Sequence, residues 1–275
     1  MTLRKSSLAE GWYPQDPEEI IRFLSAFKTS QYEGPVRAVI APHAGWFYSG
    51  KIAAKAVSCL DRGIETLALI GGHLPPCQRP LFAMEDAVQT PLGRMALDTG
   101  LRDAMIAGVQ GQEDKFQDNT VEVLLPMARF FFPEAALLWM RLPDDMSSLD
   151  VGKALAVEAC RQQRNLAVLA SADLTHYGPN YGFTSKGTGE EALKWVREVN
   201  DRRLIEAVES GNHEEVLIRA RSEGSTCSAG AILGAMGFAL ASGIGPAKLL
   251  EYGTSADAEK AAPKVSFVSY ASFRF

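Results

Sequence analysis

The chain has 275 residues, of which 47% are hydrophobic and 22% are charged, and its formal net charge is −5. A composition this close to the globular average excludes a disordered or a fibrous protein. Acidic and basic residues are mixed along the whole chain, which argues against nucleic acid or an anionic membrane as the main partner.

The distribution of apolar residues and cysteines narrows the class further. No apolar stretch reaches the roughly 18 residues of a membrane span, the longest being residues 229–240, and the N-terminal residues lack the apolar core of a signal peptide. We therefore expect a cytoplasmic protein without a membrane partner. None of the four cysteines belongs to a CxxC pair, so neither a disulfide scaffold nor a zinc ribbon is indicated.

The first half of the chain alternates helical and β-type patterns. An acidic cap, a proline and two further acids at 16–19 are typical of a helix start and predict a helix over 16–27. The β-rich run 36–41 predicts a strand, and helical spacing predicts a helix over 51–60. A second strand is predicted over 66–70, where two glycines follow.

The second half continues this alternation and predicts the fold class. Strands that alternate with helices indicate an α/β fold, with a mixed, mostly parallel sheet flanked by helices. No repeat, low-complexity tract or linker divides the chain, so we expect a single domain over 1–275. Two β-like runs near the end are predicted to pair as an antiparallel edge. The predicted strands are 135–140, 166–170, 248–252 and 265–275, and the predicted helices are 150–163, 190–209 and 228–241.

Three of the four histidines come directly after predicted strands. His43 follows the strand that ends at residue 41, His73 follows the one that ends at 70, and His176 follows the one that ends at 170. Ligands of open α/β sheets bind where loops leave the carboxyl ends of strands. Imidazole is a common ligand of iron, copper and zinc and the usual general base near neutral pH. The sequence therefore predicts that the three histidines share one pocket. The alternative for each is a loop histidine that bonds nearby polar groups.

Cys227 is the cysteine that context singles out. It follows two polar residues at the predicted start of a helix, where the dipole and the free amides favour a thiolate. A thiolate is both a soft metal ligand and a nucleophile, whereas the ordinary alternative is a small buried residue. Cys59 and Cys160 fall on helix patterns and are expected in the core. Cys77 is a reserve ligand near the second strand, and His213 is set aside as a solvated helix start.

Asn119 and Glu122 are a further candidate pair. They are three residues apart, so they would share one face if a helix begins there. A carboxylate in the pocket would serve as a proton acceptor or support a ligand. The alternative is a helix start capped by Asp118.

Several segments, taken in order, resemble one known family. The most specific are Pro-His-Ala-Gly-Trp-Phe-Tyr-Ser-Gly at 42–50 and Ser-Ala-Asp-Leu-Thr-His-Tyr-Gly at 171–178. Together with the remaining segments they resemble the Memo family, whose bacterial members are also called AmmeMemoRadiSam system protein B, over nearly the whole chain. The remaining segments are Gly-Trp-Tyr-Pro at 11–14, residues 118–126, Cys227, and Tyr-Gly-Thr-Ser at 252–255.

The resemblance implies a fold and a metal site. Memo proteins are similar to LigB-type class III extradiol dioxygenases, which have a single α/β domain and use non-haem iron. By this likeness His43 and His73 would be metal ligands, and Cys227 would stand where the dioxygenases have a carboxylate. A thiolate favours copper, zinc or iron bound through sulfur, and no nucleotide cofactor is expected. The likeness also implies His176 as acid or base, Asp173 as its orienting partner, and Trp46 and Tyr177 as further pocket residues.

The sequence departs from the family pattern at three places. Asn119 stands where histidine is usual, which removes an imidazole from the pocket. Ser228 follows the cysteine where glycine is usual, and the loop that carries His73 is short. Catalytic activity is therefore an open question.

Several functions remain open at this point. The first is a metal-dependent redox enzyme or oxygenase-like protein. The second is a non-catalytic module that binds a peptide or small anionic ligand, a role that the resemblance to animal Memo proteins implies for phosphotyrosine segments. A related option is a component of a modification system with radical-SAM and AMMECR-type partners. The last is a hydrolase with Cys227 as nucleophile and His176 as base.

Overall fold

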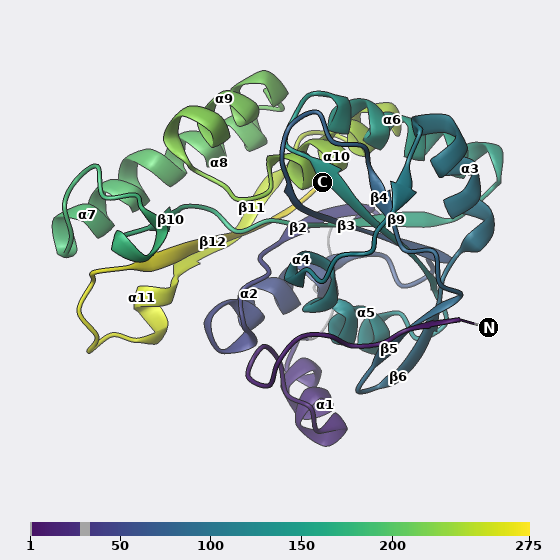
Figure 1. Cartoon of the computed structure of the whole chain (residues 1–275), viewed down its shortest axis with the longest axis horizontal. Coiled ribbons are helices and arrows are strands. Elements are labelled where there is room, and N and C mark those ends of the chain that lie inside the picture. Colours follow the sequence, from purple (N-terminus) through teal and green to yellow (C-terminus); the bar gives the residue numbers. More distant parts are fainter. Residues whose placement is uncertain (1, 28–33) are drawn as a thin grey trace.

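The computed structural model describes residues 2–27 and 34–275. Within these residues the main sheet has nine strands in the order β10-β12-β2-β9-β3-β8-β4-β7, with β11 also paired to β12 (Figure 1). Its central four strands are parallel. They are β2 (Ala38–Ala41), β9 (Leu166–Ser171), β3 (Thr66–Leu74) and β8 (Ala136–Pro143).

Antiparallel strands flank this parallel centre. On one side β12 (Phe267–Arg274) runs antiparallel to β2 and pairs with β11 (Lys248–Thr254), which confirms the predicted late antiparallel pair. The other strands of the main sheet are β10 (His176–Tyr177), β4 (Leu81–Phe82) and β7 (Gln112–Glu113), and a small separate sheet holds β1 (Leu3–Arg4), β5 (Ala87–Thr90) and β6 (Gly93–Ala96).

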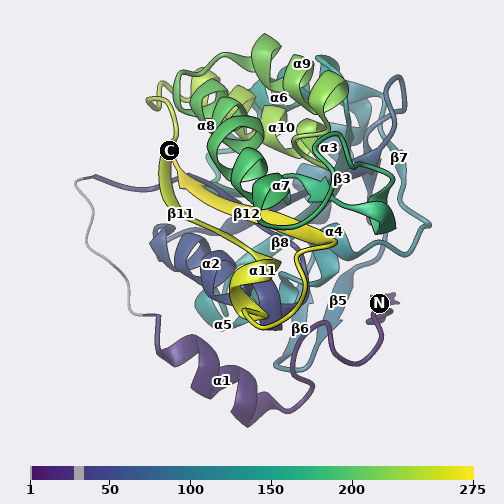
Figure 2. The same ribbon diagram turned by 90° about the vertical axis from the view of Figure 1, so that its left-hand side faces the viewer.

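Alternate residues of the central strands enter two different cores. In β2, Ala38 and Ile40 point into one core whereas Val39 and Ala41 point into the other, as expected for a sheet covered on both faces. Figures 1 and 2 show helices above and below the sheet. One face carries α3 (Thr99–Val109), α6 (Ser147–Arg161), α8 (Asp201–Glu209), α9 (His213–Glu223) and α10 (Ala229–Ala241), and the other carries α1 (Pro17–Ser25), α2 (Trp46–Cys59), α4 (Asn119–Glu122) and α5 (Leu125–Phe131).

This architecture confirms the predicted α/β class, with differences at element ends. The helix predicted over 51–60 begins at Trp46, after Gly45. The stretch predicted as one helix over 190–209 is α7 (Glu190–Trp195), a π-helical turn and α8. The remaining elements are the π-helical turn Val196–Asn200, a short 3-10 helix at Pro179–Tyr181 and α11 (Ser255–Ala258).

The two cysteines predicted to lie in the core have different environments. Cys59 is buried in α2, as predicted. Cys160 is exposed, so that prediction is wrong. Both lie on helices, but Cys160 falls on the outer side of α6, and helical spacing alone does not say which side faces the sheet.

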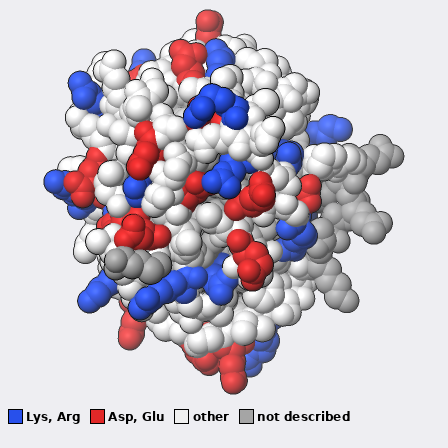
Figure 3. All heavy atoms as spheres, turned by 90° about the vertical axis from the view of Figure 1, so that its right-hand side faces the viewer, with Lys and Arg blue, Asp and Glu red and all other residues white. Residues whose placement is uncertain are grey.

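No helix in the described part of the chain is long and apolar enough to span a membrane. On the face drawn in Figure 3, Lys and Arg side chains are interspersed with Asp and Glu. This arrangement matches the mixed charge order of the sequence.

Candidate metal centre

The centre lies at the carboxyl ends of three neighbouring strands. β9 pairs on one side with β2 and on the other with β3, and all three run parallel. His43 follows β2 by two residues, Asp173 follows β9 by two residues, and His73 lies near the end of β3. Parallel neighbours end at the same edge of a sheet, so the strand order brings these side chains together.

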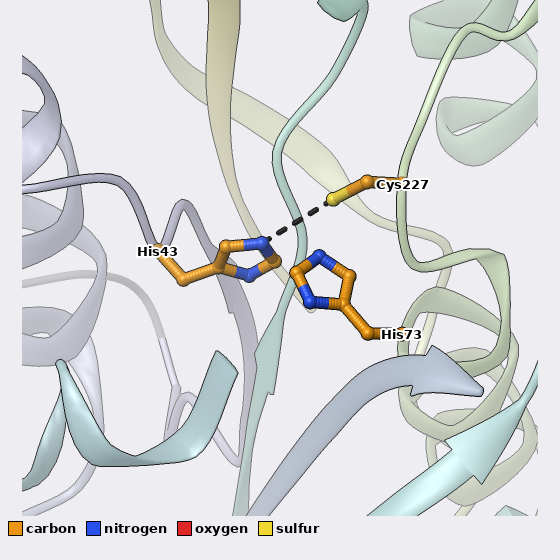
Figure 4. A group of neighbouring side chains, drawn as sticks. All are labelled: His43, His73 and Cys227. Atoms are coloured by element: carbon orange, nitrogen blue, oxygen red, sulfur yellow. Dashed lines mark hydrogen bonds between the residues drawn. The ribbon is translucent and has the colours of Figure 1, made fainter. Parts of the chain in front are cut away.

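Two histidines and one cysteine form a compact group. One ligand atom from each of His43, His73 and Cys227 lies within 4.8 Å of the others. Nε2 of His43 is 3.3 Å from Sγ of Cys227, and the two imidazole rings meet edge to face with centroids 4.9 Å apart. Figure 4 shows the three side chains converging on one point. Two donors bound to one tetrahedral ion are about 3.3 to 3.6 Å apart, given metal–ligand distances of about 2.0 to 2.3 Å. The group therefore fits one ion after only small side-chain adjustments.

Each histidine is oriented by a bond at its other nitrogen. Nδ1 of His43 lies 2.9 Å from Oγ of Ser171, and Nδ1 of His73 lies 3.1 Å from Oδ2 of Asp118. Such a partner fixes both the tautomer and the direction of a metal-binding ring. Nε2 of each ring is thereby left for the centre.

His73 reaches the centre through an irregularity in β3. The sequence predicts that this strand ends at the two glycines. In the structure it continues to Leu74, with a break in register after Gly71. His73 has a φ of 57°, in the left-handed region that few residues other than glycine occupy. A bulge of this kind re-aims a side chain, and here it directs the ring of His73 toward His43.

Mutual electrostatics favour an ion pair between Cys227 and the histidines in the metal-free group. Burial raises the pKa of the Cys227 thiol, but the surrounding imidazoles, first that of His43, lower it well below its usual value. Burial lowers the pKa of His73, but Asp118 and the Cys227 thiolate outweigh this effect and raise it to about 10. The pKa of His43 is also raised, because Asp173 and Cys227 overcome its burial. These interactions therefore favour the thiolate form of Cys227.

A cleft of about 510 Å³ opens beside the group. His43 and His73 line it, as do Asp173, His176 and Asn119. Further lining residues include the aromatic side chains of Trp12, Tyr48, Tyr181 and Tyr270, and the carboxylate of Glu259.

His176 and Asp173 lie together in this cleft. Nε2 of His176 is 3.8 Å from Oδ2 of Asp173. Burial lowers the pKa of His176, but Asp173 and Cys227 raise it to about 10. Asp173 also accepts a hydrogen bond of 2.8 Å from the His43 amide. Asn119, where the family resemblance implies a histidine, donates from Nδ2 to the carbonyl of His43 at 3.2 Å.

Three predicted pocket residues lie outside the cleft. Glu122 is buried and accepts hydrogen bonds from the N-terminal segment, including the amides of Ser7 and Leu8. Trp46 is buried and donates to the carbonyl of Val123. Tyr177 is fully buried against the ring of Phe267.

Two residues that were set aside or held in reserve also lie outside the group. Cys77 is exposed and its amide donates to Asp145. His213 begins α9, next to its cap Asn212, as predicted.

Sequence reasoning missed several residues around the group. Ser171 and Asp118 were not assigned to the two histidines, and Arg141 was not considered. Asp144 follows β8 directly, so the rule of strand ends would have found it. Its carboxylate accepts from the amide of Gly230, and burial, together with the charge of Cys227, raises its pKa to about 6.

The comparisons with known protein sequences all point to the same family. A family model described as Memo-like protein matches residues 4–274. A MEMO1 family protein of Archaeoglobus fulgidus is 26% identical over 277 residues, covering 99% of each chain. One from Pyrobaculum arsenaticum is 27% identical and covers 100% of this chain and 99% of its own. One from Methanopyrus kandleri is 28% identical, with coverages of 92% and 93%.

A solved structure shares the fold. The crystal structure of an uncharacterized protein from Escherichia coli matches with a TM-score of 0.50 at 14% identity, covering 87% of this chain and 99% of the other. At that identity the likeness concerns the fold alone. The family match spans nearly the whole sequence and includes the segments that carry the His/His/Cys group. This chain belongs to the Memo-like protein family.

Proposed function

We propose that this protein binds a transition metal through His43, His73 and Cys227 and that the metal faces a ligand in the adjoining cleft. The observation that supports this most directly is the mutual distance of the three donor atoms, all within 4.8 Å. The orientation of both imidazoles by Ser171 and Asp118 adds to it.

The donor set indicates which metals fit. Two imidazoles and one thiolate suit iron, copper or zinc and are poorly matched to magnesium or calcium, which prefer oxygen. Three protein ligands leave a position for a small molecule. When bound, the metal would supply a Lewis acid and, if it is iron or copper, a redox centre.

The surrounding residues would supply the rest of the chemistry. Asp173 holds the backbone of His43 and lies beside His176, so it would keep the His176 ring directed into the cleft. His176 would then donate or accept a proton at the ligand. Burial of His43, which is 1% exposed, would exclude water from that side of the centre.

Metal analysis tests the proposal. Protein purified without a histidine tag would be reconstituted anaerobically with Fe(II), Cu or Zn, and the bound metal measured. We expect close to one ion per chain, and loss of that ion in His43→Ala and Cys227→Ser. His213→Ala is the matched control, because His213 lies at the start of α9, outside the group. Substoichiometric metal in all reconstitutions, or no effect of His43→Ala, would overturn the proposal.

We propose a redox or oxygenase-type activity as the finer function of this site. Oxygen consumption by the iron-loaded protein in the presence of aromatic diols would test it. His176→Gln should retain the metal and lower turnover by about 10²- to 10⁴-fold, the usual contribution of a general acid or base. Asn119→His would restore the imidazole that the resemblance implies and should raise turnover. Absence of turnover in both the wild type and Asn119→His would count against it.

We propose as a second candidate the binding of an anionic ligand such as a phosphorylated peptide. His73 and His176 both line the cleft, where neighbouring carboxylates and Cys227 raise their pKa values to about 10, so these two imidazoles would be the cationic contacts of such a ligand. Calorimetry with tyrosine-phosphorylated and plain peptides would distinguish the two functions, equal weak heats being the result against binding. Capture of radical-SAM or AMMECR-type proteins would test the proposed modification system.

A further inference from the structure

Behind His73 lies a buried arginine that no part of the proposed site includes. Arg141 is on β8, opposite Gly71 of β3, and it is 4% exposed. Nε donates to the carbonyl of Gly72 at 3.1 Å, and Nη2 donates to the carbonyl of His73 at 3.5 Å. These two carbonyls belong to the bulge that turns the His73 ring toward the centre.

The same guanidinium also holds the carboxylate that orients the ring. Nη2 of Arg141 lies 3.3 Å from Oδ2 of Asp118, the oxygen that bonds Nδ1 of His73. Asp118 is further fixed by accepting hydrogen bonds from the amide and hydroxyl of Thr120. One side chain thus contacts both the backbone of His73 and the partner of its ring.

A second carboxylate keeps this buried cation in place. Nη1 of Arg141 lies 3.4 Å from Oδ1 of Asp114, whose side chain is 0% exposed. Asp114 also accepts from Nε1 of Trp139 at 3.0 Å. A planar guanidinium can serve two carboxylates and two carbonyls at fixed angles, whereas an ammonium group cannot.

From these contacts we infer that Arg141 is a positioning residue for the metal centre, which keeps His73 in its left-handed conformation with Nε2 facing the Cys227 sulfur. The inference rests on the proposed metal site. Of the three proposed ligands, Arg141 positions only His73, through its backbone and its partner Asp118. His43 is held by Ser171 and Asp173 instead. Loss of Arg141 should therefore loosen one ligand and leave the other two.

Binding of Co(II) to the metal-free protein tests the inference without any enzymatic assay. Co(II) bound by a thiolate gives a sulfur-to-metal absorption, and its visible bands report the number and arrangement of ligands. We expect Arg141→Lys to weaken Co(II) binding by about 10- to 100-fold, the usual effect of losing a residue that orients a ligand. Its spectrum should approach that of His73→Ala and keep the thiolate absorption.

Arg102→Lys is the matched control. Arg102 is also buried, and its Nη1 donates to the carbonyls of Met84 and Glu85, away from the centre. This variant should bind Co(II) like the wild type with an unchanged spectrum. Equal losses in Arg102→Lys and Arg141→Lys would show a general packing effect and overturn the inference, as would an unchanged affinity and spectrum in Arg141→Lys.

A second variant covers the case in which Arg141→Lys fails to fold. Asp118→Asn keeps the shape of the side chain but removes the charge that Arg141 contacts, and it should give the same partial loss of the His73 ligand. A wild-type affinity and spectrum in Asp118→Asn would then overturn the inference. If the wild type itself binds no Co(II), Zn or Cu, the proposed metal site fails rather than the role of Arg141 alone.

Discussion

Gly72 lies directly against Ser228, so that a Cβ built on Gly72 would be 2.4 Å from both Cβ and Oγ of Ser228. Each residue is the chain neighbour of a proposed ligand, because Gly72 precedes His73 and Ser228 follows Cys227. The Ser228 side chain therefore packs directly against the backbone of Gly72, where any side chain at position 72 would collide with it. This close approach sets the distance from β3 to the start of α10.

Gly72→Ala should separate these segments and destabilise the protein by about 1 to 3 kcal/mol, the usual cost of overpacking. Urea unfolding would measure the change, and metal titration would show weaker binding. Ser228→Gly in the same chain should restore part of the stability, because it removes the atoms that the new Cβ meets. Gly108→Ala is the control: nothing lies within 4 Å of an added Cβ there, and alanine favours the helix. A stability loss in Gly108→Ala equal to that in Gly72→Ala would contradict this account.

Cys227 should react as a thiolate at lower pH than an ordinary cysteine in the metal-free protein. The surrounding imidazoles lower its pKa, despite its burial, so its alkylation by iodoacetamide should slow much less between pH 8 and pH 6 than that of an ordinary thiol. An ordinary thiol with a pKa near 8.5 slows by roughly 75-fold over that range. His43→Ala should make the alkylation rate of Cys227 depend more steeply on pH.

Mass spectrometry would follow the reaction at each cysteine separately. The exposed Cys77 and Cys160 provide internal references in the same sample. A rate at Cys227 that falls as steeply as that of a free thiol would rule out the ion pair with the histidines.

Several parts of this centre follow from the sequence. His43, His73 and Cys227 were found because each lies at a strand end or near a helix start, and those positions depend on local patterns. The convergence at one edge follows from parallel strands, which alternating elements already indicate. The family resemblance added the pairing of these residues as ligands.

Other parts depend on tertiary contacts that no local pattern reveals. The two glycines before His73 read as the end of a strand, whereas in the structure they are strand residues that leave room for Thr120 and Ser228. Arg141 lies one residue beyond the predicted strand 135–140, and no local pattern marks it. Its role arises only because β8 pairs with β3 at that point.

Glu122 shows how a correct local prediction can lead to a different role. Asn119 and Glu122 do lie on one short helix, α4, capped by Asp118 as the alternative proposed. Asn119 faces the cleft, but Glu122 faces the N-terminal segment, where it accepts from Ser6, Ser7, Leu8 and Tyr13. The segment Ser6–Tyr13 is thereby held beside the cleft, into which its Trp12 points.

Glu122→Ala should release the segment Ser6–Tyr13 and cost about 1 to 3 kcal/mol, because partly buried hydrogen bonds to a charged carboxylate are lost. Hydrogen exchange should show the amides of Ser7 and Leu8 losing protection, while metal stoichiometry stays unchanged. Glu10→Ala, at an exposed position of the same segment, is the control. If Glu122→Gln instead abolishes turnover and leaves those amides protected, Glu122 acts as the proton acceptor first predicted.

Protonation of Asp118 should lower the free energy of unfolding in acid. Burial raises its pKa, but hydrogen bonds from His73 and Thr120 and the charge of Arg141 lower it to about 2, from 3.8. A carboxylate whose pKa is lower in the folded than in the unfolded chain stabilises the folded state at pH values above its unfolded pKa. This stabilisation disappears as the pH falls from about 4 to about 2. Asp118→Asn should therefore lose about 2 kcal/mol at pH 7 and show a flatter pH dependence below pH 4.

Urea unfolding of the metal-free protein at several pH values would measure this slope. Asp150→Asn is the control, because the Asp150 side chain is 76% exposed and its pair with Lys153 lies on the surface of α6. The same slope below pH 4 in Asp118→Asn and in the wild type would mean that other carboxylates cause the acid sensitivity.

The distance along the chain between His43 and Cys227 also has a consequence for synthesis of the protein. They are 184 residues apart, which at about 5 to 20 residues per second places roughly 10 to 40 seconds between their appearance at the ribosome. For most of that time the emerging chain carries both histidines without their sulfur partner. An ion taken up early would meet two imidazoles alone, and the sulfur-containing centre can form only after translation has passed the start of α10.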